Sequence, residues 1–139
     1  MNLIKIKQLE DGKIPKKTYE NDVCFDCYSR INTVIEKNDR TLVPLGFALQ
    51  LPDLYEAVIR PRSGLSKKGV DVAIGTIDSN YRGEVIACVI NNSKGSFEIQ
   101  KHDRICQLAI REIPDIKFEI VNELEDSERG EKGFGSSGL

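Results

Sequence analysis

Asp78 is the residue of this sequence that is best placed to do chemistry. It lies in the segment Gly75-Thr76-Ile77-Asp78-Ser79-Asn80-Tyr81-Arg82-Gly83, between two apolar runs that would hold the backbone rigidly. The sequence predicts that this segment is the end of a β-hairpin. A carboxylate on a rigid turn can orient and deprotonate an attacking water, and Tyr81 can stack on a sugar or a base. The alternative is an ordinary turn, because Asp and Asn suit turns.

The segment from Arg60 to Gly69 is a second candidate site. A strand-like run stops at Pro61, and Ser63 opens what the sequence predicts to be a single helical turn, up to residue 68. Backbone N–H groups at Ser63 and Gly64, together with the fork-shaped guanidinium of Arg62, make a suitable cradle for an anion. The alternative is an exposed basic loop.

Gln107 is a polar residue in an otherwise apolar run. Under strict alternation it shares a face with Ile105 and Ala109, and a buried amide costs free energy unless it is hydrogen-bonded. It therefore binds a ligand or satisfies a neighbouring backbone group, and the sequence leaves both open. His102, beside a lysine in a predicted turn, is expected on the surface.

The C-terminal segment is rich in glycine and serine. Residues 130–139 contain four glycines and two serines, too little to form a packed core, so the tail is expected to be mobile. Arg129, Phe134 and the glycine N–H groups can close over a ligand, with Arg on phosphate and Phe on a base. A P-loop needs a Lys directly before its Ser or Thr and lies between a strand and a helix, and this segment has neither. The alternative is a disordered tail.

Short β-strands must position these segments. Apolar–polar alternation and frequent turn residues predict strands within residues 3–7, 23–28, 33–36, 41–51 with a Pro/Gly bend, 55–61, 70–74, 84–90, 96–99 and 104–111. This pattern is typical of an all-β sandwich or closed barrel. The character of the chain changes at Asn122.

Length and composition exclude several classes of protein. The chain has 139 residues, enough for one domain, and no apolar run of 18 residues that could span a membrane. Its N-terminus alternates and lacks the apolar stretch of a signal peptide, so a location inside the cell is expected. The net charge of −2 argues against bulk binding of nucleic acid.

The four cysteines are predicted to be reduced and buried. Cys24 and Cys27 have the spacing of a zinc or redox pair. A zinc ribbon needs two such pairs, however, whereas Cys88 and Cys106 lie singly in apolar runs. Free cysteine commonly behaves as a small apolar residue.

Five segments, taken in order, resemble the five motifs of the trimeric dUTPase family, the deoxyuridine triphosphate nucleotidohydrolases. The similarity extends from about residue 20 to the C-terminus. The matching segments are Phe25-Asp26-Cys27-Tyr28-Ser29, Pro61-Arg62-Ser63-Gly64-Leu65-Ser66, Gly75 to Gly83, His102-Asp103-Arg104-Ile105-Cys106-Gln107-Leu108, and Arg129 to Gly138. His102 stands where the family frequently has Gly.

The resemblance implies an all-β, jelly-roll-like distorted barrel that assembles as a homotrimer. Residues 1–121 would form the barrel domain, and residues 122–139 a mobile arm that closes over an active site. Each of the three active sites would lie between subunits and take motifs from more than one chain. The resemblance gives no role for nucleic acid or membrane, and it suits a cytoplasmic protein, or a nuclear one in a eukaryote or virus.

The resemblance also implies a reaction, the hydrolysis of dUTP to dUMP and pyrophosphate. This would limit uracil in DNA and supply dUMP for dTMP synthesis. Asp78 would activate the water that attacks the α-phosphorus, and Tyr81 would pack on the deoxyribose. The remaining predicted substrate contacts are Arg62, Ser63, Gly64, Gln107, Arg129, Phe134, Gly135, Ser136 and Ser137, with Phe134 over uracil.

The family uses Mg²⁺, which the resemblance places mainly on substrate phosphates and water rather than on protein ligands. Asp26 and Asp103 match family aspartates with a supporting role. The nearest enzymatic rival is a dCTP deaminase, which shares the fold but typically uses Glu near the pyrimidine, whereas this segment carries Asp78. A third alternative is a module that only binds dUTP and a protein partner.

Overall fold

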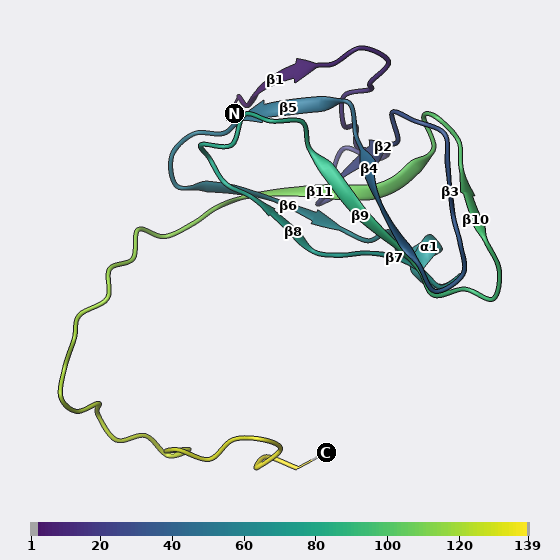
Figure 1. Cartoon of the computed structure of the whole chain (residues 1–139). Helices are drawn as coiled ribbons and strands as arrows, with labels where there is room; N and C mark the ends of the chain where they lie inside the picture. The colour runs from purple at the N-terminus through teal and green to yellow at the C-terminus, as the bar shows by residue number, and fades with distance from the viewer. Residues whose placement is uncertain (1–2, 139) are drawn as a thin grey trace.

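The computed structural model describes residues 3–138 and consists mainly of short antiparallel strands (Figure 1). The elements are β1 (Lys5–Gln8), β2 (Phe25–Tyr28), β3 (Thr33–Ile35), β4 (Arg40–Pro44), β5 (Phe47–Gln50), β6 (Tyr55–Arg60), α1 (Ser63–Ser66), β7 (Val70–Val72), β8 (Gly75–Ile77), β9 (Ile86–Asn91), β10 (Phe97–Ile99) and β11 (Arg104–Glu112). The all-β prediction is confirmed, as is the single helical turn after Pro61. In the described part of the chain, no helix has the length and apolar character needed to cross a membrane.

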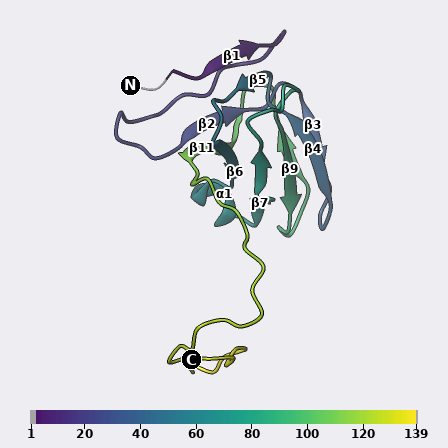
Figure 2. The same cartoon turned by 90° about the vertical axis from the view of Figure 1, so that its left-hand side faces the viewer.

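Within residues 3–138 the strands form four small sheets. Their strand orders are β2-β11-β6-β8, β4-β9-β7, β1-β5 and β10-β3, and all of these pairings are antiparallel. Figure 2 shows the sheets gathered into one body, from which the C-terminal segment extends away. The sheets enclose a common apolar core, as expected for a distorted barrel.

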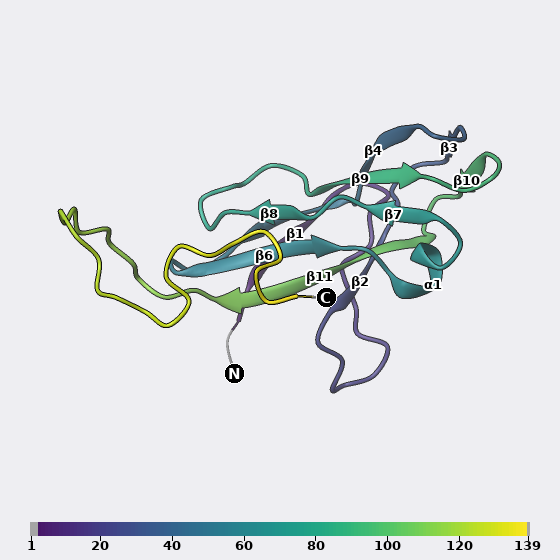
Figure 3. The ribbon, with the colours of Figure 1, turned by 90° about the horizontal axis from the view of Figure 1, so that it is seen from below.

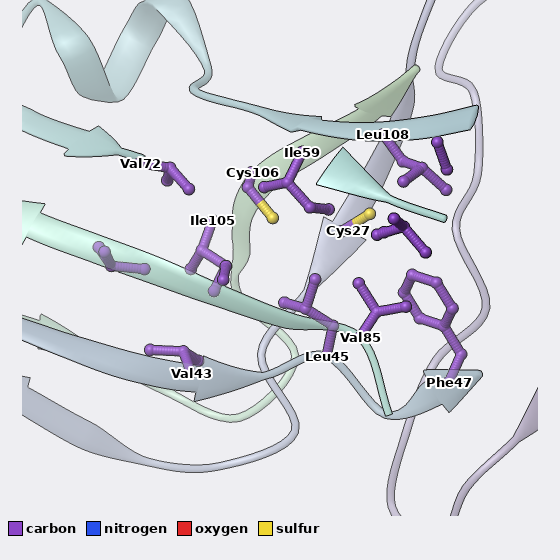
Figure 4. Packing of buried hydrophobic residues seen from close by; sticks show 14 of the residues in the cluster. Cys27, Val43, Leu45, Phe47, Ile59, Val72, Val85, Ile105, Cys106 and Leu108 are labelled. Atoms are coloured by element: carbon purple, nitrogen blue, oxygen red, sulfur yellow. The ribbon is translucent and has the colours of Figure 1, made fainter. Parts of the chain in front are cut away.

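The core is built from side chains of nearly every strand. Figure 4 shows Val43, Leu45 and Phe47 facing Ile59 and other residues of the opposite sheet. The largest side chains with almost no exposed surface are Phe47, Ile35, Leu45, Ile59, Ile99, Ile105 and Leu108. Burial of such residues removes apolar surface from water and is the main driving force for this fold.

Two strands illustrate how alternation positions the functional residues. In β9, Ala87, Val89 and Asn91 are buried while the intervening residues are at least partly exposed. In β11 the alternation breaks, because the register with β2 shifts between Arg104 and Cys106. Such a bulge re-aims the neighbouring side chains, so strict alternation is a poor guide at this position.

The cysteines are free thiols, as predicted, but two of them are only partly buried. Cys27 and Cys106 are buried, whereas Cys24 and Cys88 are half-buried. Cys27 and Cys106 lie opposite each other on β2 and β11 (Figure 4). A hydrogen bond with Cys106, together with burial, raises the pKa of the Cys27 thiol well above its ordinary value. This thiol therefore stays protonated and packs as an apolar group.

Two glycines allow the N-terminal loop to dock on the bend between β4 and β5. A Cβ atom added to Gly12 would lie 2.1 Å from the carbonyl oxygen of Gly46. Gly46 also has a φ of +78°, which L side chains rarely adopt. The amide of Leu9 donates to the Gly46 carbonyl over 2.9 Å. The bend thus becomes a junction between distant segments of the chain.

The chain leaves the barrel after β11. From residue 113 to residue 138 every residue is exposed, and the structure assigns no strand to this part. Figure 1 shows it running away from the barrel and ending in a series of turns. The predicted boundary at residue 121, and the predicted mobility of the arm, remain predictions.

Candidate active site

The Asp78 loop joins two different sheets. β8 pairs with β6, whereas β9 pairs with β4 and β7. The predicted β-hairpin is therefore wrong, since the strands on either side of the loop do not pair with each other. Ile77 is buried and anchors the start of the loop, and Val85 is buried and anchors its end. The carboxylate of Asp78 is exposed between these two anchors.

A cavity of about 210 Å³ lies beneath this loop. It is lined by Ile59, Gly75, Thr76, Ile77, Asp78, Tyr81, Glu84, Val85 and Ile86. The walls are mainly aliphatic, with the two carboxylate residues Asp78 and Glu84 and one tyrosine at the loop. A flat ligand with a polar edge fits such a lining, because apolar faces can pack while loop groups hydrogen-bond its edge.

Tyr81 folds back on its own loop. Its hydroxyl donates to the carbonyl of Glu84 over 2.9 Å, and its amide donates to the carbonyl of Asp78 over 3.1 Å. A Cβ atom added to Gly83 would lie 2.4 Å from the tyrosine hydroxyl, so any other residue at that position would push the ring aside. The ring remains 44% exposed and offers a face to a ligand in the cavity.

A cluster of charged side chains forms where β2, β11 and the start of α1 meet. The Asp26 carboxylate lies 3.2 Å from Nε of Arg62 and 3.4 Å from Nη1 of Arg104. The hydroxyl of Thr18 also donates to Asp26, over 3.0 Å. Arg62 in turn donates to the main-chain carbonyl of Arg104. The carboxylate thus holds two guanidinium groups together, as an anion-binding cradle requires.

Gln107 and Asp103 both hydrogen-bond main-chain groups. The amide Nε2 of Gln107 donates to the Pro61 carbonyl over 2.9 Å. In this chain Gln107 therefore satisfies a neighbouring backbone group, which was one of the two alternatives for this residue. This contact links β11 to the turn that carries Arg62. Asp103 accepts a hydrogen bond from the amide of Gln100 over 2.8 Å and thereby closes the turn before β11.

His102 occupies a backbone conformation that favours glycine. Its φ is +72°, a region that few residues other than glycine adopt. Its Nε2 lies 2.8 Å from the carbonyl oxygen of Asp11, and its amide donates to the Ser29 carbonyl. The histidine is partly exposed and lies in a turn of the fold.

The predicted tail residues lie apart from the other candidates in this chain. Arg129 donates through Nε to the carbonyl of Lys132 over 2.7 Å, and together with Ser136 and Ser137 it lines a shallow hollow. Gly135 and the fully exposed Phe134 belong to the same turns. Figure 1 shows these turns away from the barrel, so within one chain they contact neither the Asp78 loop nor the cradle.

The Asp78 loop and the arginine cradle lie at opposite ends of β6. Ala57 pairs with Ile77, the residue before Asp78, whereas Arg60 pairs with Gln107 beside the cradle. Ala57 and Arg60 are three positions apart on β6, roughly 10 Å at the usual rise of a strand, and the loop and the cradle lie beyond them. Figure 3 shows α1 and the loop after β8 at opposite ends of the molecule.

Three features of the site were not predicted from the sequence. Arg104 joins the cradle, although only its motif was noted, and Thr18 comes from a loop without a recognisable pattern. Glu84, directly after the Asp78 segment, lines the cavity and pairs with Arg30. Its position next to the segment was a usable signal for Glu84, whereas nothing local marked Arg30.

The resemblance implies a magnesium ion that takes most of its ligands from the substrate and from water. Residues 3–138 contain no cluster of three His, Cys, Asp or Glu side chains that could enclose a metal. The cradle does hold a carboxylate, Asp26, but its two oxygen atoms already contact the guanidinium groups of Arg62 and Arg104. Phosphate oxygens and water would complete the coordination of such an ion.

Comparison with known proteins gives consistent relatives. The family model described as dUTPase matches residues 10–138. A deoxyuridine 5'-triphosphate nucleotidohydrolase of Clostridioides difficile is 42% identical over 140 residues, covering 98% of each chain. One from Orientia tsutsugamushi is 43% identical over 145 residues and also covers 98% of each. The dUTPase of Staphylococcus bacteriophage 80alpha, solved with dUPNHPP, superposes with a TM-score of 0.94 at 28% identity, covering 100% of both chains.

Clustered guanidinium groups commonly bind phosphate. The arginine cradle and the exposed carboxylate loop on this all-β barrel are therefore typical of proteins that bind phosphorylated ligands. The relatives narrow that class. The chain belongs to the dUTPase family. The resemblance predicted from the five motifs is thereby confirmed.

Proposed function

We propose that this chain hydrolyses dUTP to dUMP and pyrophosphate. The observation that carries the proposal is the exposed Asp78 carboxylate on a loop anchored by Ile77 and Val85, beside a cavity suited to a flat base. Asp78 takes a proton from water while the water oxygen bonds to the α-phosphorus. The bond from that phosphorus to the bridging oxygen breaks, and pyrophosphate leaves. The names of the relatives support this reaction.

Tyr81 selects the sugar. Its ring is fixed through its hydroxyl and lines the same cavity as Asp78. A deoxyribose packed on this ring leaves no room for a 2′-hydroxyl, and an unpaired hydroxyl against an apolar face costs free energy. Main-chain groups of the loop read the edge of the uracil. Phe134 of the C-terminal arm covers the base.

The triphosphate binds at the cradle. Arg62, Ser63 and Gly64 supply a guanidinium, a hydroxyl and backbone N–H groups at the start of α1, and Gln107 lies against the same turn. Arg129, Gly135, Ser136 and Ser137 of the arm add further donors. Mg²⁺ held by phosphate oxygens and water neutralises charge on the triphosphate, with Asp26 and Asp103 in supporting positions. A protein of similar structure, a mutant dUTPase of phage phi11, was solved with a structural Mg(II) ion.

The distance between the loop and the cradle supports a site shared between subunits. Asp78 and Arg62 lie at opposite ends of β6, at positions roughly 10 Å or more apart along the strand, so one chain holds them at separate places. A homotrimer solves this problem, because rotation symmetry brings the loop of one chain to the cradle of the next. The arm, which runs away from its own barrel, then closes a neighbour's site.

Two exposed apolar surfaces support the same assembly. Ile116, Phe118 and Ile120 alternate with charged residues in the extended segment after β11 and are largely exposed. Leu42 and Ile86 are exposed on the sheet of β4 and β9. A segment with a strand pattern and an unpartnered sheet face are typical of surfaces that another chain covers. In the proposed trimer, neighbouring copies of this chain cover both surfaces.

Pyrophosphate release from dUTP, dCTP, dTTP and UTP, with and without Mg²⁺, tests the proposal. We expect rapid release from dUTP, strong dependence on Mg²⁺ and little turnover of the other three. Ammonia produced from dCTP would identify the deaminase alternative instead. Tight binding of dUTP without any turnover would identify a binding module. Sedimentation of the purified protein tests the trimer.

A further inference from the structure

Arg30 and Glu84 form a two-pronged ion pair between segments that lie far apart in the sequence. Nε of Arg30 donates to one carboxylate oxygen of Glu84 and Nη2 to the other, each over 2.7 Å. The two side chains are only 32% and 19% exposed. A fork-shaped contact of this kind fixes the orientation of both planes, whereas a single exposed contact would not.

The pair also holds Glu84 to the bend between β4 and β5. The amide of Gly46 donates to the same carboxylate over 2.9 Å, and the amide of Arg30 donates to the Pro44 carbonyl over 2.9 Å. Main-chain hydrogen bonds from Leu45 to Val85 and from Val85 to Phe47 run beside these contacts. The end of the Asp78 loop is therefore clamped to a bend that belongs to another part of the barrel.

Tyr81 depends on this clamp. Its hydroxyl donates to the main-chain carbonyl of Glu84, so a shift of Glu84 moves the acceptor that holds the ring. The loop has no support from a hairpin partner, because β8 and β9 belong to different sheets. The main chain of Tyr81 is also held by the Asp78 carbonyl and by the guanidinium of Arg82, but its ring is tied through the hydroxyl to the residue that Arg30 anchors.

We propose that Glu84, held by Arg30, is a positioning residue that fixes Tyr81 against the sugar and so sets the preference for deoxyribose over ribose. The inference rests on the role of Tyr81 under the proposed function. A tyrosine that can swing aside still contacts deoxyribose but no longer excludes a 2′-hydroxyl. Loss of the clamp therefore affects discrimination between dUTP and UTP more than it affects the turnover of dUTP.

The variant Arg30→Met tests this directly, because it removes the guanidinium of a residue that lies outside the cavity. We expect the ratio of kcat/KM for dUTP to kcat/KM for UTP to fall about tenfold, the scale of one well-formed coupled contact. The kcat for dUTP should stay within about twofold. Arg30→Lys keeps the charge but loses one prong, and should give an intermediate ratio.

The matched control is Arg111→Met, which breaks the ion pair between Arg111 and Glu56, two residues that do not line the cavity. It should leave the ratio unchanged. Tyr81→Phe keeps the ring but loses the hydroxyl that reaches Glu84, so it should lower the ratio like Arg30→Met. The double variant should then add nothing further.

Several results would overturn the inference. One is a wild-type ratio in folded Arg30→Met, or in Arg30→Lys if Arg30→Met does not fold. Another is an equal fall in Arg111→Met. A third is full additivity of the Arg30→Met and Tyr81→Phe effects. An unchanged ratio in Tyr81→Ala would instead overturn the proposed role of Tyr81 in sugar selection, which separates the two failures.

Discussion

Mixing two inactive variants tests whether the halves of the active site come from different subunits. Asp78→Asn removes the proposed base, and we expect kcat to fall by roughly 10²–10⁴ while dUTP still binds. Arg62→Ala removes the guanidinium from the cradle and should weaken turnover by about 10–100-fold, the value of a charge-assisted hydrogen bond. Each variant keeps the half of the site that the other lacks.

The arrangement along β6 determines how much activity the mixture regains. Asp78 and Arg62 lie at opposite ends of that strand, and in the proposed trimer one catalytic site takes them from different chains. After random reassembly of equal amounts, each required residue is intact in half of the chains. About a quarter of the sites therefore regain both residues. If both residues served one site from the same chain, no site would regain both.

The assay measures pyrophosphate release after the two variants are unfolded together and refolded at one total concentration. Asp78→Asn mixed with Tyr81→Ala is the matched control, because both residues lie on the same loop and must come from the same chain. That mixture should show no recovery. The reasoning fails if the activity of the first mixture equals the mean activity of its two components although ion-exchange chromatography shows mixed oligomers. It also fails if the control mixture regains as much activity as the first mixture.

Three further outcomes follow from the contacts in the barrel. Truncation before Arg129 should leave the melting temperature within about 1 °C, because the removed residues are exposed and away from the barrel, yet should cripple hydrolysis; full activity would show that the arm has no role. Asp26→Asn should lower the free energy of unfolding by about 1–2 kcal/mol and raise KM, since Arg62 loses its partner. An unchanged free energy of unfolding in urea titrations, together with an unchanged KM, would contradict this prediction. The hydrogen bond from Arg30 lowers the pKa of Glu84 below its ordinary 4.5, so its stabilisation is complete above that value and is lost as the pH falls through the lower, folded-state pKa. Urea titrations at pH 6 and below should show that Glu84→Gln loses less free energy of unfolding on acidification than the unaltered protein does. An equal loss would contradict the role given to Glu84.

Local pattern in the sequence was enough to predict where most strands lie. Alternation located β9 and β11 to within about two residues, because a half-buried strand must place apolar residues on one face. Proline and the following Ser-Gly pair predicted α1. The short strand β8 was missed, since three residues next to a turn carry too little periodicity. Gln107 was grouped with Ile105 and Ala109 by strict alternation, but the bulge between Arg104 and Cys106 interrupts that alternation at Ile105.

Partner choice is the information that local pattern does not contain. Periodicity reports which face of a strand is buried, and says nothing about which strand lies beside it. Two apolar runs around a turn therefore predicted a hairpin, whereas β8 and β9 diverge into different sheets. A loop that spans two sheets cannot rely on cross-strand hydrogen bonds for its shape, so it needs anchors from elsewhere. Arg30, 54 positions from Glu84, is such an anchor, and only the folded chain reveals it. The precision of the Asp78 loop is thus a property of the seam between the sheets, and substitutions at that seam should alter specificity without touching the substrate.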